Sequence, residues 1–443
     1  MSTMTAGPAE STLAAADFDT LAGGLTEPEA VAGARAAAWE RFTALPWPTK
    51  KSEEWRYTDL TKVGFGALTP VVPAPATAEA LSADVREVLG RSGERAGVVV
   101  LREGRVAHLE LEPEVARSGV VLCSIRDAAD RHLEVLRRAL FEAQPGPAEE
   151  KLWALHLALL GGGYFLHVPR GVEMPAPIHA FHIVERAGTL SSAHSFVYGE
   201  EAARASVIDE FLSDDLEAET VSLHGATITG EAGAGIEYVA LQRFGRGVKR
   251  FSTQHVAAGR DSRIVTFNVT LGGDLSRADV TSRLDGPGSD SEMLALWFGD
   301  SDQHFDHHTL QHHAAPHAHS DLLFKGALTD SGSSVFRGLI KVDKGAQLTD
   351  AYQTNRNLLL SEGSHASALP NLEIEADDVR CSHGATIGQV EDGQLFYLMS
   401  RGLTRRQAER LLVFGFFDEV LGRLPMEGVR VRVREAIEEK IGL

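Results

Sequence analysis

The sequence predicts a mainly β protein with helical regions at both ends. From about residue 151, short runs of β-branched and aromatic residues separated by glycine continue for more than about two hundred residues. The chain before this stretch is rich in alanine and glutamate, and after Gly402 the apolar residues return to helical spacing. We therefore expect an N-terminal helical and mixed α/β region at 1–150, a β core at 151–392 and a C-terminal helical region at 393–443.

The bulk composition excludes several classes of protein. A chain of 443 residues is long enough for about three domains. Its 43 basic and 62 acidic residues give a net charge of −19, which repels nucleic acid and anionic membranes. No apolar run reaches the length of about 18 residues that a membrane span needs. Two cysteines, Cys123 and Cys381, cannot form a disulfide framework, so we expect a cytoplasmic protein.

The N-terminal region contains three predicted elements. Apolar residues at helical spacing from Val31 to Leu45 predict a helix, which Pro46 ends. The run Val98 to Leu101 resembles a buried strand, and residues 128–140 have the pattern of a second helix.

The β core shows the period-two pattern of strands. Val265, Phe267, Val269 and Leu271 alternate with more polar residues, which predicts a half-buried strand over 264–271. Similar runs begin near Phe165, Ile178, Ser206, Ile236, Met293, Leu322, Val335 and Leu372. The segment 224–228 recurs as 383–387, a weak sign that one structural unit is reused. Solenoids, sandwiches and barrels all fit this spacing, so periodicity alone leaves the architecture open.

Two helices are predicted near the C-terminus. Thr404 and Gln407 form a capping box that begins the first, and Val429, Val433 and Ile437 recur every fourth residue in the second. These helices are more apolar than a solvent-facing tail. They could cover the open end of the β region, or they could present a docking surface for another protein, and both can hold together.

The common catalytic signatures are absent from the sequence. Lys51 is the only lysine followed by serine or threonine, and it lacks the glycines of a phosphate-binding P-loop. Gly233 and Gly235 begin a dinucleotide-like pattern, but Tyr238 occupies the third glycine position. Neither a Gly-x-Ser-x-Gly elbow nor a His-Glu zinc-protease motif is present. The sequence therefore argues against ATP hydrolysis and conventional hydrolase chemistry.

Seven of the 18 histidines fall between residues 304 and 319. They are His304, His307, His308, His312, His313, His317 and His319. In a helix, His304, His308 and His312 would share one face, which suits zinc; in an extended segment, His317 and His319 would share a side. The acidic residues that could join such a site are Asp302, Asp306 and Asp321. A metal-dependent enzyme that uses this segment is the alternative function, whereas a structural role for hydrogen-bonded histidines is the simpler interpretation.

Cys381 and His383 form the most specific candidate site. Because alternate side chains of a strand share a face, their thiol and imidazole would point the same way. Sulfur and imidazole suit iron or zinc, but a cluster needs about four such ligands, so a partner would have to supply the others. The competing interpretation is that Cys381 is a small buried apolar residue.

Five segments of the chain resemble the SufB/SufD family of iron–sulfur cluster assembly proteins. These segments are Lys51–Leu60, Phe336–Gly338, Thr349–Ser361, Leu372–Thr386 and Leu395–Gly402. Within the family, the chain is more similar to the SufD branch, because the N-terminal cysteine cluster often found in SufB is missing. The resemblance implies a right-handed parallel β-helix between helical N- and C-terminal regions.

The resemblance also implies a function and partners. A SufD-like chain is a non-catalytic scaffold that pairs with a SufB-like subunit in a heterodimer and binds a SufC-like ATPase through its C-terminal helices. A homodimer is possible when the chain is alone. The family's interface histidine and adjacent cysteine fall on His383 and Cys381, which would share a transient iron–sulfur cluster with the partner. No tightly bound cofactor is expected, and no glycine fingerprint supports a flavin site. The residues expected to dock the ATPase are Arg405, Leu411, Leu412, Phe416 and Phe417.

Overall fold

A computed structural model describes most of the chain. The described residues are 15–25, 27–71, 85–86, 89–90, 94–137, 140, 150–424 and 426–441. None of the helices in these ranges is long and apolar enough to cross a lipid bilayer. The cytoplasmic location stays a prediction.

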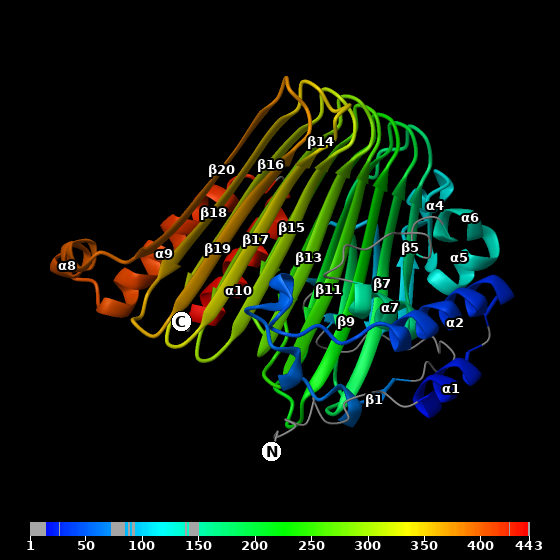
Figure 1. Ribbon diagram of the computed structural model, residues 1–443, viewed down its shortest axis with the longest axis horizontal. Coiled ribbons are helices and arrows are strands. Elements are labelled where there is room, and N and C mark those ends of the chain that lie inside the picture. The colour runs from blue at the N-terminus through cyan, green and yellow to red at the C-terminus, as the bar shows by residue number, and fades with distance from the viewer. Residues whose placement is uncertain are drawn as a thin grey trace, which may run out of the picture.

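The central element is a solenoid of about eight turns, with two strands in each turn. The odd-numbered strands from β5 onward pair in parallel in one sheet, called here the odd sheet: β5 (Gly162–Val168), β7 (Thr189–Gly199), β9 (Thr220–Gly230), β11 (Val248–Ala258), β13 (Leu275–Leu284), β15 (His304–His313), β17 (Ser333–Val342) and β19 (His365–Ile374). The even sheet contains β6 (Ile178–Ile183), β8 (Arg204–Leu212), β10 (Gly235–Arg243), β12 (Arg263–Thr270), β14 (Asp290–Gly299), β16 (His319–Leu328), β18 (Asp350–Leu359) and β20 (Arg380–Gln389). Figure 1 shows the strands running side by side along the molecule. The predicted parallel β-helix between helical end regions is confirmed.

Alternation along each strand separates an inner face, which lines the lumen of the solenoid, from an outer face. In β12, Ile264 packs in the lumen core, whereas Val265, Phe267 and Val269 pack outward against the C-terminal helices. The predicted strand is therefore present but buried on both faces, not half-buried. Parallel sheets are normally covered on both sides in this way.

The N-terminal region completes the first end of the solenoid. β2 (Gly97–Arg102) pairs with β6 and with β3 (Arg105–Leu111), and β4 (Val121–Ser124) pairs with β5. The short β1 (Thr69–Pro70) lies beside β7. The strand predicted at 98–101 is thus confirmed. The single helix predicted over 128–140 is wrong where the structure describes it, because α5 (Ile125–Arg131) and α6 (Leu133–Leu136) are separated at His132.

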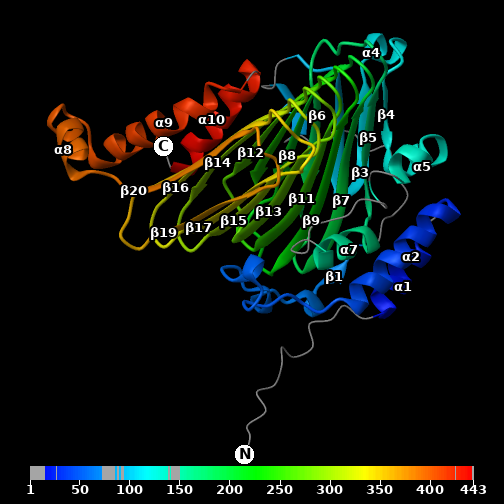
Figure 2. The ribbon, with the colours of Figure 1, turned by 45° about the horizontal axis from the view of Figure 1, so that its top comes forward.

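N-terminal helices cover the outer face of the odd sheet, on one side of the solenoid (Figure 2). These are α1 (Ala15–Gly23), α2 (Glu29–Ala44) and α7 (Glu150–Ala158). The helix predicted from Val31 to Leu45 is confirmed as α2. Other short helical turns in the described part of the chain include α4 (Pro113–Arg117) and 3₁₀ turns at Glu53–Trp55, Leu60–Lys62 and Phe65–Ala67.

The C-terminal helices lie along the other side of the solenoid (Figures 1 and 2). They are α8 (Asp392–Ser400), α9 (Arg405–Leu421) and α10 (Glu427–Ile441). The predicted capping box at Thr404 and Gln407 begins α9. Apolar residues of α9 and α10 pack on the outer face of the even sheet, and Arg432 of α10 pairs with the buried Glu210 of β8. The helices therefore flank the sheet, and the expectation that they cover the open end of the β region is wrong.

Phe417 provides a test of how α9 is attached. Its side chain is fully buried between α9 and the even sheet, so Phe417→Ala should lower the free energy of unfolding by about 3 kcal/mol in urea titrations. The matched control is Phe396→Ala in α8, where the side chain is 75% exposed; its effect should stay within about 0.5 kcal/mol. Equal effects of the two substitutions would contradict the described packing of α9.

Candidate functional site at the open end of the solenoid

The last strand of the even sheet carries the candidate ligands. β20 pairs in register with β18, so that Cys381 lies beside Ala351 and His383 beside Gln353. Ala351 and Gln353 are buried in the lumen, at 1% and 0% exposure. Neighbouring residues in parallel register face the same way, so Cys381 and His383 both point toward the lumen of the last turn. The predicted sharing of one face by these two side chains is confirmed.

The position of β20 at the edge of its sheet determines how exposed these groups are. Gln353, one turn earlier, is fully buried, whereas His383 is exposed at the corresponding inner position. Cys381 is half-buried against a small apolar cluster that includes Val342 and Ala351. Both groups can therefore be reached by another molecule, although they occupy positions that are interior in every earlier turn.

The same open end exposes part of the apolar core. In β17, Ile340 and Val342 are completely buried, but their register partners in β19, Leu372 and Ile374, are 38% and 40% exposed. Ile387 of β20 is also exposed. Apolar groups of this kind gathered on a surface usually mark a binding site. The sequence did not single out Ile374 or Ile387 for this role; their place in the last strands follows only from the number of turns.

The electrostatic environment keeps Cys381 protonated. Partial burial raises the pKa of its thiol, and the negative charge of Asp350 raises it further. A thiolate is the form that binds metal and attacks electrophiles. In the isolated chain this cysteine is accordingly a weak ligand and a weak nucleophile, and a cation brought to the open end would favour its deprotonation.

The histidine-rich segment is a strand and a turn, not a helix. Residues 304–313 form β15, which excludes the helical alternative, in which His304, His308 and His312 would stack on a helix face. These three side chains do lie on one face of the strand, but each has a protein partner: Thr58 for His304, Asp306 for His308 and Asp343 for His312.

The remaining members of the segment are separated from that face. His307 and His313 are buried toward the lumen, His317 lies in a turn with φ of +58°, and His319 begins β16. The three candidate carboxylates, Asp302, Asp306 and Asp321, pair with Arg246, Arg277 and Arg423 respectively. These contacts give the histidines and carboxylates structural roles, and none of them favours a metal-dependent enzyme that uses residues 304–319.

The repeated sequence at 224–228 and 383–387 does not mark equivalent positions. The first copy lies in β9 of the odd sheet, where His224 is buried, and the second lies in β20 of the even sheet, where His383 is exposed.

The residues expected to dock an ATPase differ in accessibility. Arg405 and Leu411 are exposed on α9, Leu412 and Phe416 are half-buried, and Phe417 is fully buried against the even sheet. Phe417 can therefore support a docking surface but cannot contact a partner directly. The structure adds three exposed apolar side chains on α8 that were missing from the predicted set: Phe396, Tyr397 and Met399. The sequence could have indicated these residues, because they lie close together in a short apolar run.

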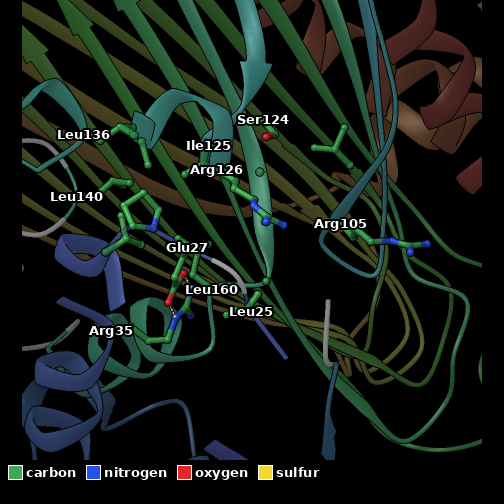
Figure 3. A pocket seen from close by; sticks show the side chains of 17 residues that line it. Leu25, Glu27, Arg35, Arg105, Ser124, Ile125, Arg126, Leu136, Leu140 and Leu160 are labelled. Carbon is green, nitrogen blue, oxygen red and sulfur yellow. Dashed lines mark hydrogen bonds and ion pairs between the residues drawn. The ribbon is translucent and has the colours of Figure 1, made fainter. Parts of the chain in front are cut away.

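A separate cavity of about 120 Å³ lies in the N-terminal region (Figure 3). Apolar residues such as Val31, Ile125 and Leu160 line most of it, and an ion pair between Arg35 and Glu27 borders it. Its wall includes Gly162 at the start of β5, which lies near the opposite end of the odd sheet from β19. This cavity is thus not part of the open end.

Comparison with known proteins gives matches over most of the chain. Residues 182–416 match the family model "SUF system FeS cluster assembly, SufBD core domain", and residues 25–180 match "SufBD protein N-terminal region". The Iron-sulfur cluster assembly protein SufD of Bacillus subtilis is 30% identical over 94% of this chain and 95% of its own length. A SufBD family protein of Mycobacterium leprae is 39% identical over 48% of this chain and 56% of its own length. Protein ABCI7, chloroplastic, of Arabidopsis thaliana is 25% identical over 91% of this chain and 85% of its own length.

The effect of Asp350 on Cys381 can be measured by alkylation. Asp350 disfavours the thiolate, so Asp350→Asn should lower the pKa of Cys381 and speed its reaction with iodoacetamide at pH 8 by a few fold, as followed by peptide mass spectrometry. Cys123 in β4 is an internal control, because its pKa is raised to about 11 by burial and Asp127. An unchanged or slower reaction of Cys381, with Cys123 constant, would exclude this electrostatic effect.

Proposed function

The chain belongs to the SufBD family of iron–sulfur cluster assembly proteins, and from this we propose that it is a SufD-like, non-catalytic scaffold subunit. In this role it completes a cluster assembly site together with a SufB-like partner. The observation that carries the proposal is the pair of the half-buried Cys381 and the exposed His383 on the uncovered last turn of the solenoid. Two ligands are too few for an iron–sulfur cluster, which usually takes about four.

Pairing with the SufB-like subunit is proposed to occur at the open end. β19 and β20 are the terminal strands of their sheets, and they carry the exposed apolar side chains of Leu372, Ile374 and Ile387. A partner that continued one or both sheets would satisfy the free backbone groups of these edges and bury the apolar side chains. The same surface could pair two copies of this chain when the SufB-like subunit is absent.

The chemistry of the shared site is proposed to depend on the partner. The imidazole of His383 can ligate iron when neutral, as imidazoles do in other metal sites. The thiol of Cys381 must lose its proton before it can do so, and its raised pKa opposes this in the isolated chain. Arrival of the iron, which is the cargo of the complex, would favour the thiolate. Ligand formation would thus accompany closure of the interface.

The SufC-like ATPase is proposed to dock on α8 and the exposed side of α9. The large apolar side chains exposed there are Phe396, Tyr397 and Met399 of α8 and Leu411 of α9. Docking at this place has a physical connection to the cluster site, because Glu419 of α9 pairs with Arg356 of β18 and β18 is the neighbour of β20. A displacement of α9 by the ATPase would therefore act on the strand next to His383.

His383→Ala tests the assembly role. The variant should still co-purify with SufB-like and SufC-like subunits but should form clusters at least about tenfold more slowly in reconstitution, because one ligand is missing. The matched control is His365→Ala, which removes another exposed histidine at the open end, on β19. Normal cluster formation by His383→Ala would remove the role assigned to this residue.

Leu411→Glu tests the docking surface. A charge at this exposed position should weaken binding of the SufC-like ATPase by about 2 kcal/mol, or roughly 30-fold, as measured by calorimetry on the purified chain. Val431→Glu is the matched control, because Val431 on α10 is similarly exposed, at 48% against 52% for Leu411. Unchanged affinity of Leu411→Glu, or an equal loss for both variants, would place the docking surface elsewhere.

A further inference from the structure

A cluster of buried polar side chains lies in the lumen, several turns away from the open end. It contains His182 of β6, Asp209 of β8 and His224 of β9, which the chain brings together from both sheets. All three face inward, since their side chains are between 0% and 6% exposed and lie among the apolar residues of the lumen core. Histidine and aspartate are rarely enclosed in an apolar interior without a specific partner.

The ligand atoms of this cluster converge on one point. All of them lie within 4.8 Å of one another. The Nε2 atom of His182 is 3.5 Å from Oδ1 of Asp209, and that of His224 is 3.9 Å from Oδ2. These distances are long for hydrogen bonds. They are close to the separation of about 3.3 Å between ligands that bind one tetrahedral ion at about 2.0 to 2.1 Å. Closing the site around an ion would draw the ligand atoms, which are spread over up to 4.8 Å, together to about this separation.

A fourth group faces the same point. The hydroxyl oxygen of Ser195 lies 3.4 Å from Nε2 of His182 and 3.1 Å from Nε2 of His224. One hydroxyl proton can be donated to only one of these nitrogens at a time. The hydroxyl can therefore serve both imidazoles only if one of them donates its Nε2 proton, whereas an ion between them and Asp209 would bind the lone pairs of both.

The carboxylate is already held in place by outer hydrogen bonds. The hydroxyl of Tyr164 donates to Oδ1 of Asp209 at 2.7 Å, and that of Tyr238 donates to Oδ2 at 2.5 Å. Such hydrogen bonds to a ligating carboxylate are typical of metal sites, where they fix its orientation. Both tyrosines are almost completely buried, so water does not compete for these contacts.

The charges in the lumen limit the occupancy to one ion. Two neutral imidazoles and one carboxylate suit a divalent transition metal such as zinc or ferrous iron. Arg250 is also buried on the inner face, with its guanidinium 4.3 Å from the ring of Phe211, and its positive charge interacts with that of Asp209. Because this charge already offsets that of the carboxylate, it opposes cations in the lumen and leaves no place for a second ion.

We propose that His182, Asp209 and His224 bind one zinc or ferrous ion, which joins strands of the two sheets near the N-terminal end of the solenoid. The ion would be structural and separate from the cluster site at the open end. This inference departs from the expectation, drawn from the sequence, that the chain has no tightly bound cofactor. The ion would stabilise the folded chain, because binding to the folded state alone raises its stability.

Metal analysis of the full chain tests this inference. Anaerobically purified protein should contain about one equivalent of zinc or iron by mass spectrometry, and the ion found decides between the two. The double variant His182→Asn/His224→Asn should contain less than about 0.1 equivalent. His307→Asn is the matched control, because His307 is also buried toward the lumen but lies further along the solenoid, stacked on Trp297.

A second measurement keeps the test decisive if the double variant fails to fold. Wild-type chain unfolded in chelator and refolded with Co²⁺ should show the visible absorption of a tetrahedral site, and Zn²⁺ should abolish it. The inference is overturned if the wild type is metal-free as purified and also after refolding with Zn²⁺ or Fe²⁺. It is likewise overturned if a folded double variant retains the metal. Neither result bears on cluster assembly at His383, which is measured independently.

Discussion

In-register parallel pairing is the constraint on which the rest of the structure depends. Because equivalent positions of successive strands face the same way, each turn covers the apolar core of the turn before it. The N-terminal strands close the first end: β2 pairs in parallel with β6, whereas β3 and β4 add antiparallel pairs to β2 and β5. No later turn covers β19 and β20 within the described chain, so positions that are buried at Ile340 and Val342 become exposed at Leu372 and Ile374. The open end is therefore a consequence of turn number and not of an unusual local sequence.

The outer faces of the two sheets must also be covered, because the strands are buried on both sides. The helices before and after the solenoid cover these faces. Buried charged groups help to attach these covers. Arg432 of α10 pairs with Glu210 on one side, and on the other side Arg277, which pairs with Asp306 within the odd sheet, lies against the ring of Trp55 from the N-terminal region. The pKa of Glu210 is lowered to about 2, mainly by its partners His179 and Arg432 working against burial, so its charge persists at neutral pH. Loss of one member of such a pair would leave an uncompensated buried charge.

Sequence patterns predicted individual strands well and their assembly poorly, for physical reasons. Period-two alternation identified β12 and placed Cys381 and His383 on one face, because both are properties of a single strand. The spacing of His304, His308 and His312 could not distinguish a helix from a strand, since a spacing of four is one face of a strand as well as nearly one helical turn. The cluster of His182, Asp209 and His224 left no signal, because only pairing between turns brings these residues together.

The edge strands also link ligand supply to partner binding in the proposed assembly. An exposed strand edge invites unspecific pairing unless something limits it. β19 contains Pro370, which lacks a backbone donor, whereas β20 contains no proline along its ten residues. β20 is thus the edge better suited to continuous pairing, and it is the strand that carries Cys381 and His383. A strand that extends the even sheet would lie beside β20, with its own side chains next to those of Cys381 and His383. Any ligand that it contributes therefore reaches them at the moment when the apolar end is covered and water is excluded.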